Sequence, residues 1–292
     1  MINNYRTYLK PNSLSPDVFT GSRWPDFVKF WLEHGVDPNE ITCIPSKENT
    51  LSSSVPTAVG VIATTEALSN GLLPGSFASK HFLMEGYGGV GSNAVDLLIN
   101  EHKVPAGNIT VIDPNEEACF KAELTGVTAV CIDANKYYNL NPSNGNHFDI
   151  WVNNAIGDTV GMQEVICLLN SGVKIFVGGA NNLFLVSELE ILLDLIAQAK
   201  AYAFPDFACS GGGWVMAVLE QIRKATGKLS INALDVIKDR NVKMVHDALE
   251  GFVAGGNLWQ TVAAQADVKI ERALQQHNKL TDADFEIKNW PL

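Results

Sequence analysis

Residues 86–91 read Gly-Tyr-Gly-Gly-Val-Gly, a spacing of glycines that suits phosphate binding. They follow the apolar run Phe-Leu-Met-Glu and open a stretch with helical spacing. Gly86 permits a tight turn, Gly88 lets the backbone approach a pyrophosphate, and Gly91 lets the helix pack closely on the strand. The helix N-terminus adds unpaired N–H groups and the positive end of the helix dipole. The pattern predicts a dinucleotide-phosphate site formed by Gly86, Gly88, Gly89, Val90 and Gly91.

A carboxylate stands where the ribose of such a dinucleotide is expected. Asp113 ends the next apolar run and follows Gly91 by about 20 residues, the spacing typical of a carboxylate on the adenosine ribose. Residues 114–117 read Pro-Asn-Glu-Glu and offer no cation to a ribose 2′-phosphate. We therefore expect NAD rather than NADP as the cofactor. The alternative for Asp113 is an ordinary strand-end carboxylate that caps the following helix.

Short apolar runs alternate with helical stretches through the middle of the chain. The predicted strands are residues 81–85, 109–113, 127–131, 150–153, 174–177 and 201–204. The predicted helices are residues 57–68, 92–101, 116–124, 159–169, 187–197, 215–225, 231–249 and 260–277. This alternation implies right-handed crossovers and a parallel sheet covered on both faces. The expected fold class is α/β, a Rossmann-like doubly wound parallel sheet with a small N-terminal region and C-terminal helices.

The length of 292 residues is consistent with about two domains. We divide the chain into a short N-terminal region at 1–56, a Rossmann-like dinucleotide-binding domain at 57–225 and a C-terminal helical region at 226–292.

The composition limits the partners and the compartment. The net charge of -11 disfavours nucleic-acid binding, because an acidic surface repels phosphate backbones. We expect no membrane span, because no run approaches ~18 apolar residues, and no signal peptide, because the first residues lack an apolar core. The five cysteines include no Cys-x-x-Cys pair, which favours free thiols and a cytoplasmic protein. The six histidines show no metal-ligand spacing, so no metal is expected.

Four further segments carry a resemblance to a known family. Residues 55–60 read VPTAVG, residues 148–157 read FDIWVNNAIG, residues 177–182 read VGGANN, and residues 203–213 read AFPDFACSGGG. Together with the glycine pattern, they make residues 54–219 resemble the C-terminal dinucleotide-binding domain of the Glu/Leu/Phe/Val amino-acid dehydrogenases. The segments occur in the family's order and span somewhat over half of the chain.

The resemblance implies an NAD-binding enzyme whose strand-end loops surround the nicotinamide ring. It places Thr57 near the nicotinamide amide, Ala155 and Ile156 along the cofactor, and Asn181 at the nicotinamide ribose or carboxamide. The alternative for Asn181 is that it forms, with Asn182, a turn pair that tolerates left-handed backbone. Members of the family are oligomers, so the resemblance also implies at least a homodimer.

The chain departs from the family where the family's catalyst lies. The family's substrate domain carries a Gly-Gly-Gly-Lys-Gly-Gly segment and a later catalytic Asp, and neither pattern occurs before residue 80. Ser210 replaces an Asn of the last motif, which the resemblance places near the substrate. In oxidative deamination the Lys polarises a water or carbonyl and the Asp shuttles protons, so this chain needs another acid or base.

Three residues are candidate catalytic groups in their place. Glu85 directly precedes the glycine pattern, where a carboxylate in a crevice can serve as acid or base. Its alternative is a helix-cap or loop contact. Asp206 and Ser210 lie on a predicted loop that lines the cleft, and the alternative for Asp206 is backbone hydrogen bonding in the turn.

Other positions carry a weaker expectation. Lys47 and Glu48 either project into the cleft or form a solvated pair. Cys209 is a nucleophile only if electropositive surroundings lower the pKa of its thiol. Trp151 and Trp214 either pack in the core or shape an aromatic pocket for a bulky substrate.

Three functions fit these observations. The first is an NAD-dependent oxidoreductase that acts on an amino acid, imine or keto-acid-like small molecule, with a shortened substrate region that indicates a specialised biosynthetic reaction. The alternative is a non-redox enzyme that reuses the fold for condensation or cyclisation of an amino-acid-derived substrate. The third is a non-catalytic NAD sensor, which needs only the adenosine half of the site.

Overall fold

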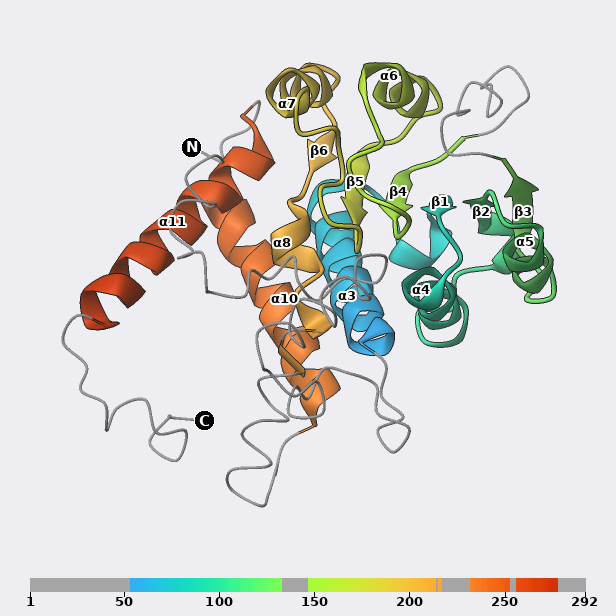
Figure 1. Ribbon diagram of the computed structural model, residues 1–292, viewed down its shortest axis with the longest axis horizontal. Helices are drawn as coiled ribbons and strands as arrows, with labels where there is room; N and C mark the ends of the chain where they lie inside the picture. Colours follow the sequence, from blue (N-terminus) through green and yellow to red (C-terminus); the bar gives the residue numbers. More distant parts are fainter. Residues whose placement is uncertain (1–52, 133–146, 214, 217–231, 253–255, 278–292) are drawn as a thin grey trace, which may run out of the picture. The chain divides into compact units, whose positions relative to one another are not determined.

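The computed structural model describes residues 53–132, 147–213, 215–216, 232–252 and 256–277 (Figure 1). The chain divides into two compact units, Met1–Ser52 and Ser53–Leu292, and the described residues all belong to the second. Lys47, Glu48, Trp214 and almost all of the helix predicted at 215–225 lie outside the described residues. The division at residues 56 and 225 stays a prediction.

Six parallel strands form one sheet in the order β3-β2-β1-β4-β5-β6. They are β1 (Phe82–Glu85), β2 (Ile109–Asp113), β3 (Thr128–Cys131), β4 (Ile150–Asn153), β5 (Ile175–Gly178) and β6 (Tyr202–Ala203). The order reverses between β1 and β4, so the carboxyl ends of these strands flank the switch point where open parallel sheets bind ligands. The predicted doubly wound α/β fold is confirmed.

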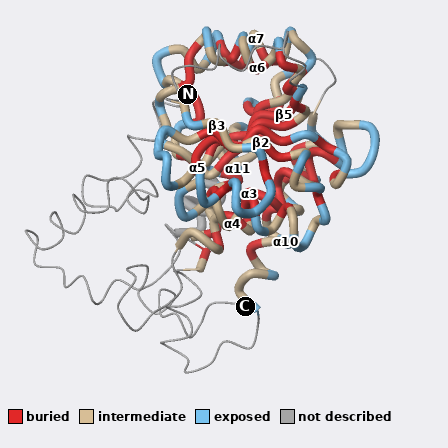
Figure 2. Tube along the Cα trace, turned by 90° about the vertical axis from the view of Figure 1, so that its right-hand side faces the viewer, coloured by how far each residue is buried: buried red, intermediate tan, exposed pale blue. Residues whose placement is uncertain are grey.

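Helices cover both faces of the sheet (Figure 2). One face carries α3 (Ser54–Leu72), α4 (Gly89–Asn100), α5 (Glu116–Glu123), α10 (Ala233–Gly251) and α11 (Leu258–His277). The other carries α6 (Met162–Asn170) and α7 (Leu189–Gln198). Short helical turns lie at η4 (Phe77–Ser79), η5 (Ala106–Asn108) and α8 (Asp206–Cys209). No helix in the described part of the chain is long and apolar enough to cross a membrane.

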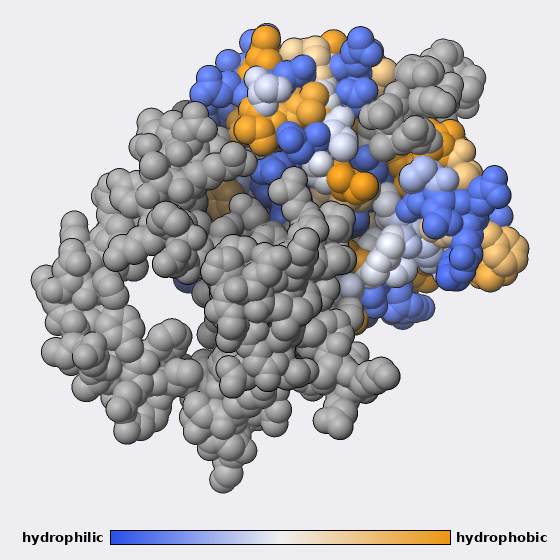
Figure 3. Space-filling view, viewed as in Figure 1, coloured by the Kyte–Doolittle hydropathy of each residue, from blue (hydrophilic) through white to orange (hydrophobic). Residues whose placement is uncertain are grey.

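The central strands form because their side chains are apolar on both sides. Every residue of β1, β4 and β5 is buried, as expected for strands sandwiched between two helix layers. The edge strand β3 instead begins and ends with exposed residues. On the displayed face, small hydrophobic groups alternate with hydrophilic ones (Figure 3).

Buried polar contacts fix the helix layer beside the sheet. Asn241 on α10 donates from its amide nitrogen to Gly60 O at 2.9 Å, Thr64 Oγ1 at 3.0 Å and Cys209 O at 3.1 Å. These bonds tie α10 to α3 and to the end of α8. One fully buried amide therefore links three elements at the carboxyl side of the sheet.

Candidate functional site

The glycine pattern forms the tight turn between β1 and α4. Gly86 has a φ of +84°, and a Cβ there would lie 2.9 Å from the backbone of Ala155. A Cβ on Gly91 would overlap the carbonyl oxygen of Gly86. By contrast, a Cβ on Gly88 would meet nothing within 4 Å, so the backbone there faces open space. Gly86 and Gly91 shape the turn, and Gly88 leaves room for a ligand.

The first turn of α4 suits an anion. Gly88 is the N-cap residue, no side chain caps the helix, and its first turn holds no acidic residue. The first N–H groups of a helix have no partner within the helix. A phosphate at this end would accept from them and meet the positive end of the dipole.

Asp113 lies at the end of β2 beside this turn. Its Oδ2 accepts from the Tyr87 N–H at 2.7 Å, and its Oδ1 accepts from the Asn115 N–H at 2.8 Å. The cap of α5 is not Asp113 but Asn115, whose side-chain oxygen accepts from two backbone N–H groups of the first turn. The capping alternative for Asp113 is therefore wrong, and its half-buried carboxylate keeps lone pairs for ribose hydroxyls.

A second group of side chains surrounds Gly179, directly after β5. A Cβ on Gly179 would lie 3.0 Å from Asn154 Oδ1, 3.1 Å from Val90 Cγ1 and 3.4 Å from Thr57 Cγ2. Asn154 Oδ1 accepts from the Gly179 N–H at 3.2 Å. Its buried Nδ2 has no hydrogen-bond partner among the described residues, which is costly unless a ligand accepts from it. Sequence reasoning missed Asn154, although it directly precedes Ala155 in the same motif.

The loops after β4, β5 and β6, which carry three of the family-like segments, contact one another. A Cβ on Gly157 would overlap the backbone of Asn181. Asp158 donates its N–H to Asn182 O at 2.7 Å, and Asp206 Oδ2 accepts from the Asn182 N–H at 2.9 Å. Asp158 and Asn182 both adopt positive φ, +61° and +53°. The loops that carry Ala155, Ile156 and Asn181 therefore lie together at the carboxyl end of the sheet, and Ile156 is 67% exposed.

The three candidate catalytic residues do not form one cluster. Glu85 is buried, and its Oε2 accepts from Trp151 Nε1 at 3.1 Å. Ser210 donates its hydroxyl to Asp206 O at 2.8 Å. Strands β4 and β5 separate the end of β1 from that of β6, a distance of roughly three strand spacings, or ~14 Å. Glu85 and the Asp206–Ser210 pair are thus separate candidates for an acid or base.

The pocket alternative for Trp151 and the nucleophile alternative for Cys209 are wrong, and the core alternative for Trp151 is confirmed. Trp151 is 0% exposed and lies in an aromatic cluster with Phe176 and Phe184, so it does not line a substrate pocket. Cys209 donates its thiol to Gly178 O at 2.7 Å, and burial raises its pKa to about 12. A buried, protonated thiol is a poor nucleophile.

A cation that sequence reasoning missed lies beside the last motif. Arg240 Nη1 donates to Asn241 Oδ1 at 2.9 Å, and a Cβ on Gly211 would meet the guanidinium at 3.4 Å. Within residues 53–277 as described, no carboxylate forms an ion pair with Arg240, and its burial lowers the pKa of the guanidinium. No local pattern marks Arg240, because the fold alone brings α10 to this turn.

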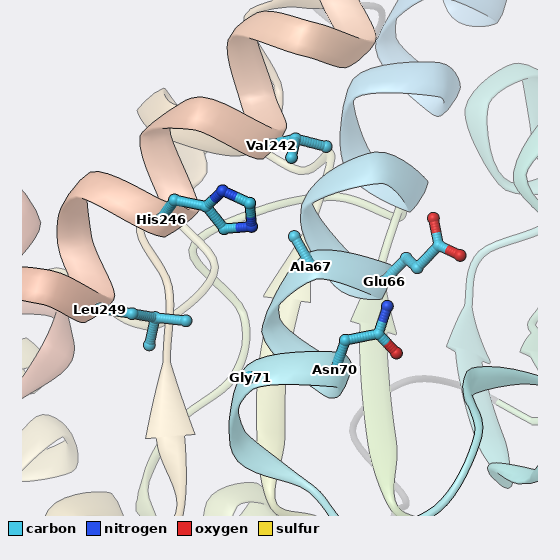
Figure 4. A pocket seen from close by; sticks show the side chains of 7 residues that line it. All are labelled: Glu66, Ala67, Asn70, Gly71, Val242, His246 and Leu249. Carbon is cyan, nitrogen blue, oxygen red and sulfur yellow. The ribbon is translucent and has the colours of Figure 1, made fainter.

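A groove of about 260 Å³ lies elsewhere, between α3 and α10 (Figure 4). It is lined by Glu66, Ala67, Asn70, Gly71, Val242, His246 and Leu249. These residues come from the later halves of the two helices, whereas Thr57, at the candidate dinucleotide site, lies on the first turn of α3. The groove is therefore separate from that site. No group of three possible metal ligands occurs among the described residues.

Similar solved structures share this fold. L-Tryptophan dehydrogenase from Nostoc punctiforme is 20% identical, with a TM-score of 0.57, over 82% of this chain and 66% of that one. Hetero-hexameric glutamate dehydrogenase from Thermus thermophilus is 16% identical, with a TM-score of 0.59, over 86% and 60%. Plasmodium falciparum glutamate dehydrogenase 2 is 18% identical, with a TM-score of 0.56, over 78% and 53%. The chain thus spans about half to two thirds of these proteins.

A comparison with curated protein sequences gives no significant match. The family model for glutamate/leucine/phenylalanine/valine dehydrogenases, in contrast, matches residues 51–279, which include every described element from α3 to α11. The expected resemblance is confirmed over most of the chain. The chain belongs to the glutamate/leucine/phenylalanine/valine dehydrogenase family.

Proposed function

We propose that the protein is an NAD-dependent oxidoreductase acting on an amino acid, an imine or a keto-acid-like small molecule. The observation that carries the cofactor choice is Asp113, whose carboxylate is fixed by the Tyr87 and Asn115 N–H groups beside the phosphate turn. A carboxylate binds two ribose hydroxyls well and repels a 2′-phosphate. Membership of an amino-acid dehydrogenase family supports the substrate class.

The residues present fit a nicotinamide dinucleotide. The open backbone at Gly88 and the uncapped start of α4 would hold the phosphates, and Asp113 the adenosine ribose. Thr57 would hold the nicotinamide half together with Asn154, whose buried Nδ2 has no hydrogen-bond partner in the part of the chain that the structure describes. When bound, the nicotinamide ring supplies hydride transfer to or from the substrate carbon.

The substrate contacts that we propose lie near the same strand-end loops. Arg240 would pair with a substrate carboxylate, since a half-buried guanidinium without a carboxylate partner among the described residues favours an anion. Asp206 accepts from the Asn182 loop, and Ser210 directly precedes Gly211, which adjoins Arg240. These two are therefore the candidates nearer to Arg240 for moving a proton. Glu85, held by Trp151, would act from the β1 side. A homo-oligomer would complete the pocket.

The test is a titration of the purified chain with NADH and NADPH, followed by nucleotide fluorescence and thermal stability. We expect NADH to bind more tightly than NADPH, and Asp113→Ala to weaken NADH binding by about tenfold or more, since hydrogen bonds to charged groups are worth ~1.5–3 kcal/mol. Asp96→Ala, which removes the same charge from an exposed position on α4, is the control.

Two results would contradict the proposal in different ways. Tighter binding of NADPH would overturn the choice of NAD. No binding of either dinucleotide at millimolar concentration would overturn hydride transfer altogether. The non-redox alternative, an acid/base reaction of an amino-acid-derived substrate in the same crevice, would then take its place.

A further inference from the structure

Two thiols lie side by side where β2 ends. Cys119 is on α5, and its Sγ donates to Asp113 O at 3.2 Å. Cys131 ends β3, opposite Asp113 in the strand register, and its Sγ lies 3.7 Å from Pro114 O. The two sulfurs therefore contact successive carbonyl groups of one turn. That turn carries the carboxylate proposed to bind the adenosine ribose.

The two thiols differ in access. Cys131 is exposed, and Cys119 is buried. Burial is the first cause that raises the pKa of Cys119 to about 11, and the neighbouring Cys131 thiol is the second. When an exposed thiol lies beside a buried one, the exposed thiol reacts first with a small oxidant. The buried thiol then displaces that adduct and forms a disulfide with the first.

We propose that Cys119 and Cys131 form a dithiol site that small linear disulfides oxidise to an internal disulfide. The Cys131 thiolate attacks one sulfur of the small disulfide, breaks its S–S bond and releases one thiol that keeps the proton lost by Cys131. Cys119 is mostly protonated, so the second step is the slow one: its minor thiolate form attacks the Cys131 sulfur and releases the second thiol, which takes the Cys119 proton. Two protein thiols are oxidised and one small disulfide is reduced to two thiols.

The surroundings select the charge of the oxidant. The carboxylates of Asp113, Glu116 and Glu117 lie on the same turn or on the first turn of α5. Lys121 pairs with Glu117 at 2.7 Å, which leaves Asp113 and Glu116 as net negative charge. A cationic disulfide such as cystamine will therefore react faster than anionic oxidised glutathione.

Oxidation is coupled to the nucleotide site. The disulfide removes both S–H donors from the Asp113 and Pro114 carbonyls, so the turn loses two of the contacts that hold it, while the Tyr87 and Asn115 bonds to the Asp113 carboxylate remain. Asp113 in turn holds the Tyr87 N–H of the phosphate turn. Loss of one neutral hydrogen bond corresponds to about a fivefold change in affinity, and we expect NADH to bind about fivefold more weakly after oxidation. This coupling rests on the proposed function.

The experiment treats the full chain with cystamine or oxidised glutathione, then blocks free thiols and maps the peptides by mass spectrometry. Peptide mapping distinguishes this pair from Cys43, Cys167 and Cys209. The matched variants are Cys131→Ser, which changes an exposed position, and Cys167→Ser, which removes a half-buried thiol on α6. NADH titrations are made on each protein before and after oxidation, and again after reduction.

The expected result is a Cys119–Cys131 cross-linked peptide in the wild type and in Cys167→Ser, formed faster with cystamine, with a reversible loss of NADH affinity. Cys131→Ser gives no cross-link and no change of affinity. Recovery of Cys131 as a stable mixed disulfide beside free Cys119 would overturn the dithiol site. A cross-link without an affinity change would overturn the coupling, and failure of the reduced protein to bind NADH would overturn the proposed function alone.

Discussion

The polar residues of the two halves of the site differ in how completely their hydrogen bonds are satisfied. Asp113, on the proposed adenosine side, accepts two backbone N–H groups, so its position is set before any ligand arrives. Asn154, on the proposed nicotinamide side, uses its oxygen on Gly179 and leaves its nitrogen unpartnered among the described residues. A buried unpartnered donor gains most from a ligand. If the proposed cofactor binds there, the hydrogen bond to Asn154 Nδ2 would contribute binding energy that positions the reacting ring.

Arg240 gives a prediction about the substrate. Replacing its guanidinium in Arg240→Met removes the proposed partner of a substrate carboxylate, so KM should rise by about 10- to 100-fold while NADH affinity stays unchanged. Steady-state kinetics with a keto or amino acid that turns over, together with NADH titration, measure both quantities. Lys243→Met, an exposed cation on the same helix, should change neither. An unchanged KM in Arg240→Met would remove the residue from the substrate site.

Cys209 gives a prediction about alkaline pH. Its folded pKa of about 12 lies above its ordinary value, so the folded state retains a proton that the unfolded state releases as pH rises above ~9. Its contribution to the free energy of unfolding is fully present below that pH and declines above it. Urea unfolding at pH 8 and pH 10 should therefore show a smaller gap between wild type and Cys209→Ala at pH 10. A gap that widens would contradict this burial.

The buried amide of Asn241 holds the helix layer in addition to its apolar contacts. Asn241→Ala leaves Gly60 O and Cys209 O without this donor in the core and should lower the free energy of unfolding by about 1–3 kcal/mol. Urea unfolding measures the change, and an unaltered dependence on urea would show that the folded state stays compact. Asn100→Ala, the same change at an exposed position, should stay within ~0.5 kcal/mol of wild type. Equal losses in both variants would refute the role of Asn241.

The strands and helices were largely predictable from the sequence, but the tertiary contacts between them were not. Strands such as β1 and β4 are apolar on both sides and bounded by polar residues or glycine, so their limits fall within a residue of the prediction. The glycine pattern and Asp113 are local sequence features, so the turn between β1 and α4 and the carboxylate at the end of β2 were also predictable. Trp151 and its partner Glu85 lie 66 residues apart, and Arg240 reaches Gly211 only through the packing of α10. Such contacts depend on tertiary packing, which periodicity does not encode.

At the scale of the whole molecule, the described residues supply the proposed dinucleotide half of the site more completely than the substrate half. The described unit supplies the sheet edge, the phosphate turn and the strand-end loops, and the chain spans only 53–66% of the dehydrogenases compared with it. The Gly-Gly-Gly-Lys-Gly-Gly segment that the family resemblance implies does not occur before residue 80. A second copy of the chain is the source we propose for the missing wall of the substrate pocket.

This proposal predicts different concentration dependences for binding and turnover. If a second copy completes the pocket, activity per chain falls when the protein is diluted below the dissociation constant of the dimer, because assembly follows mass action. NADH binding, which needs residues of one copy only, does not fall. Added salt should shift the loss of activity to lower concentration, since it screens the repulsion between chains of net charge -11. Light scattering across the same dilutions reports the mass, and full activity from a monomer would exclude a shared site.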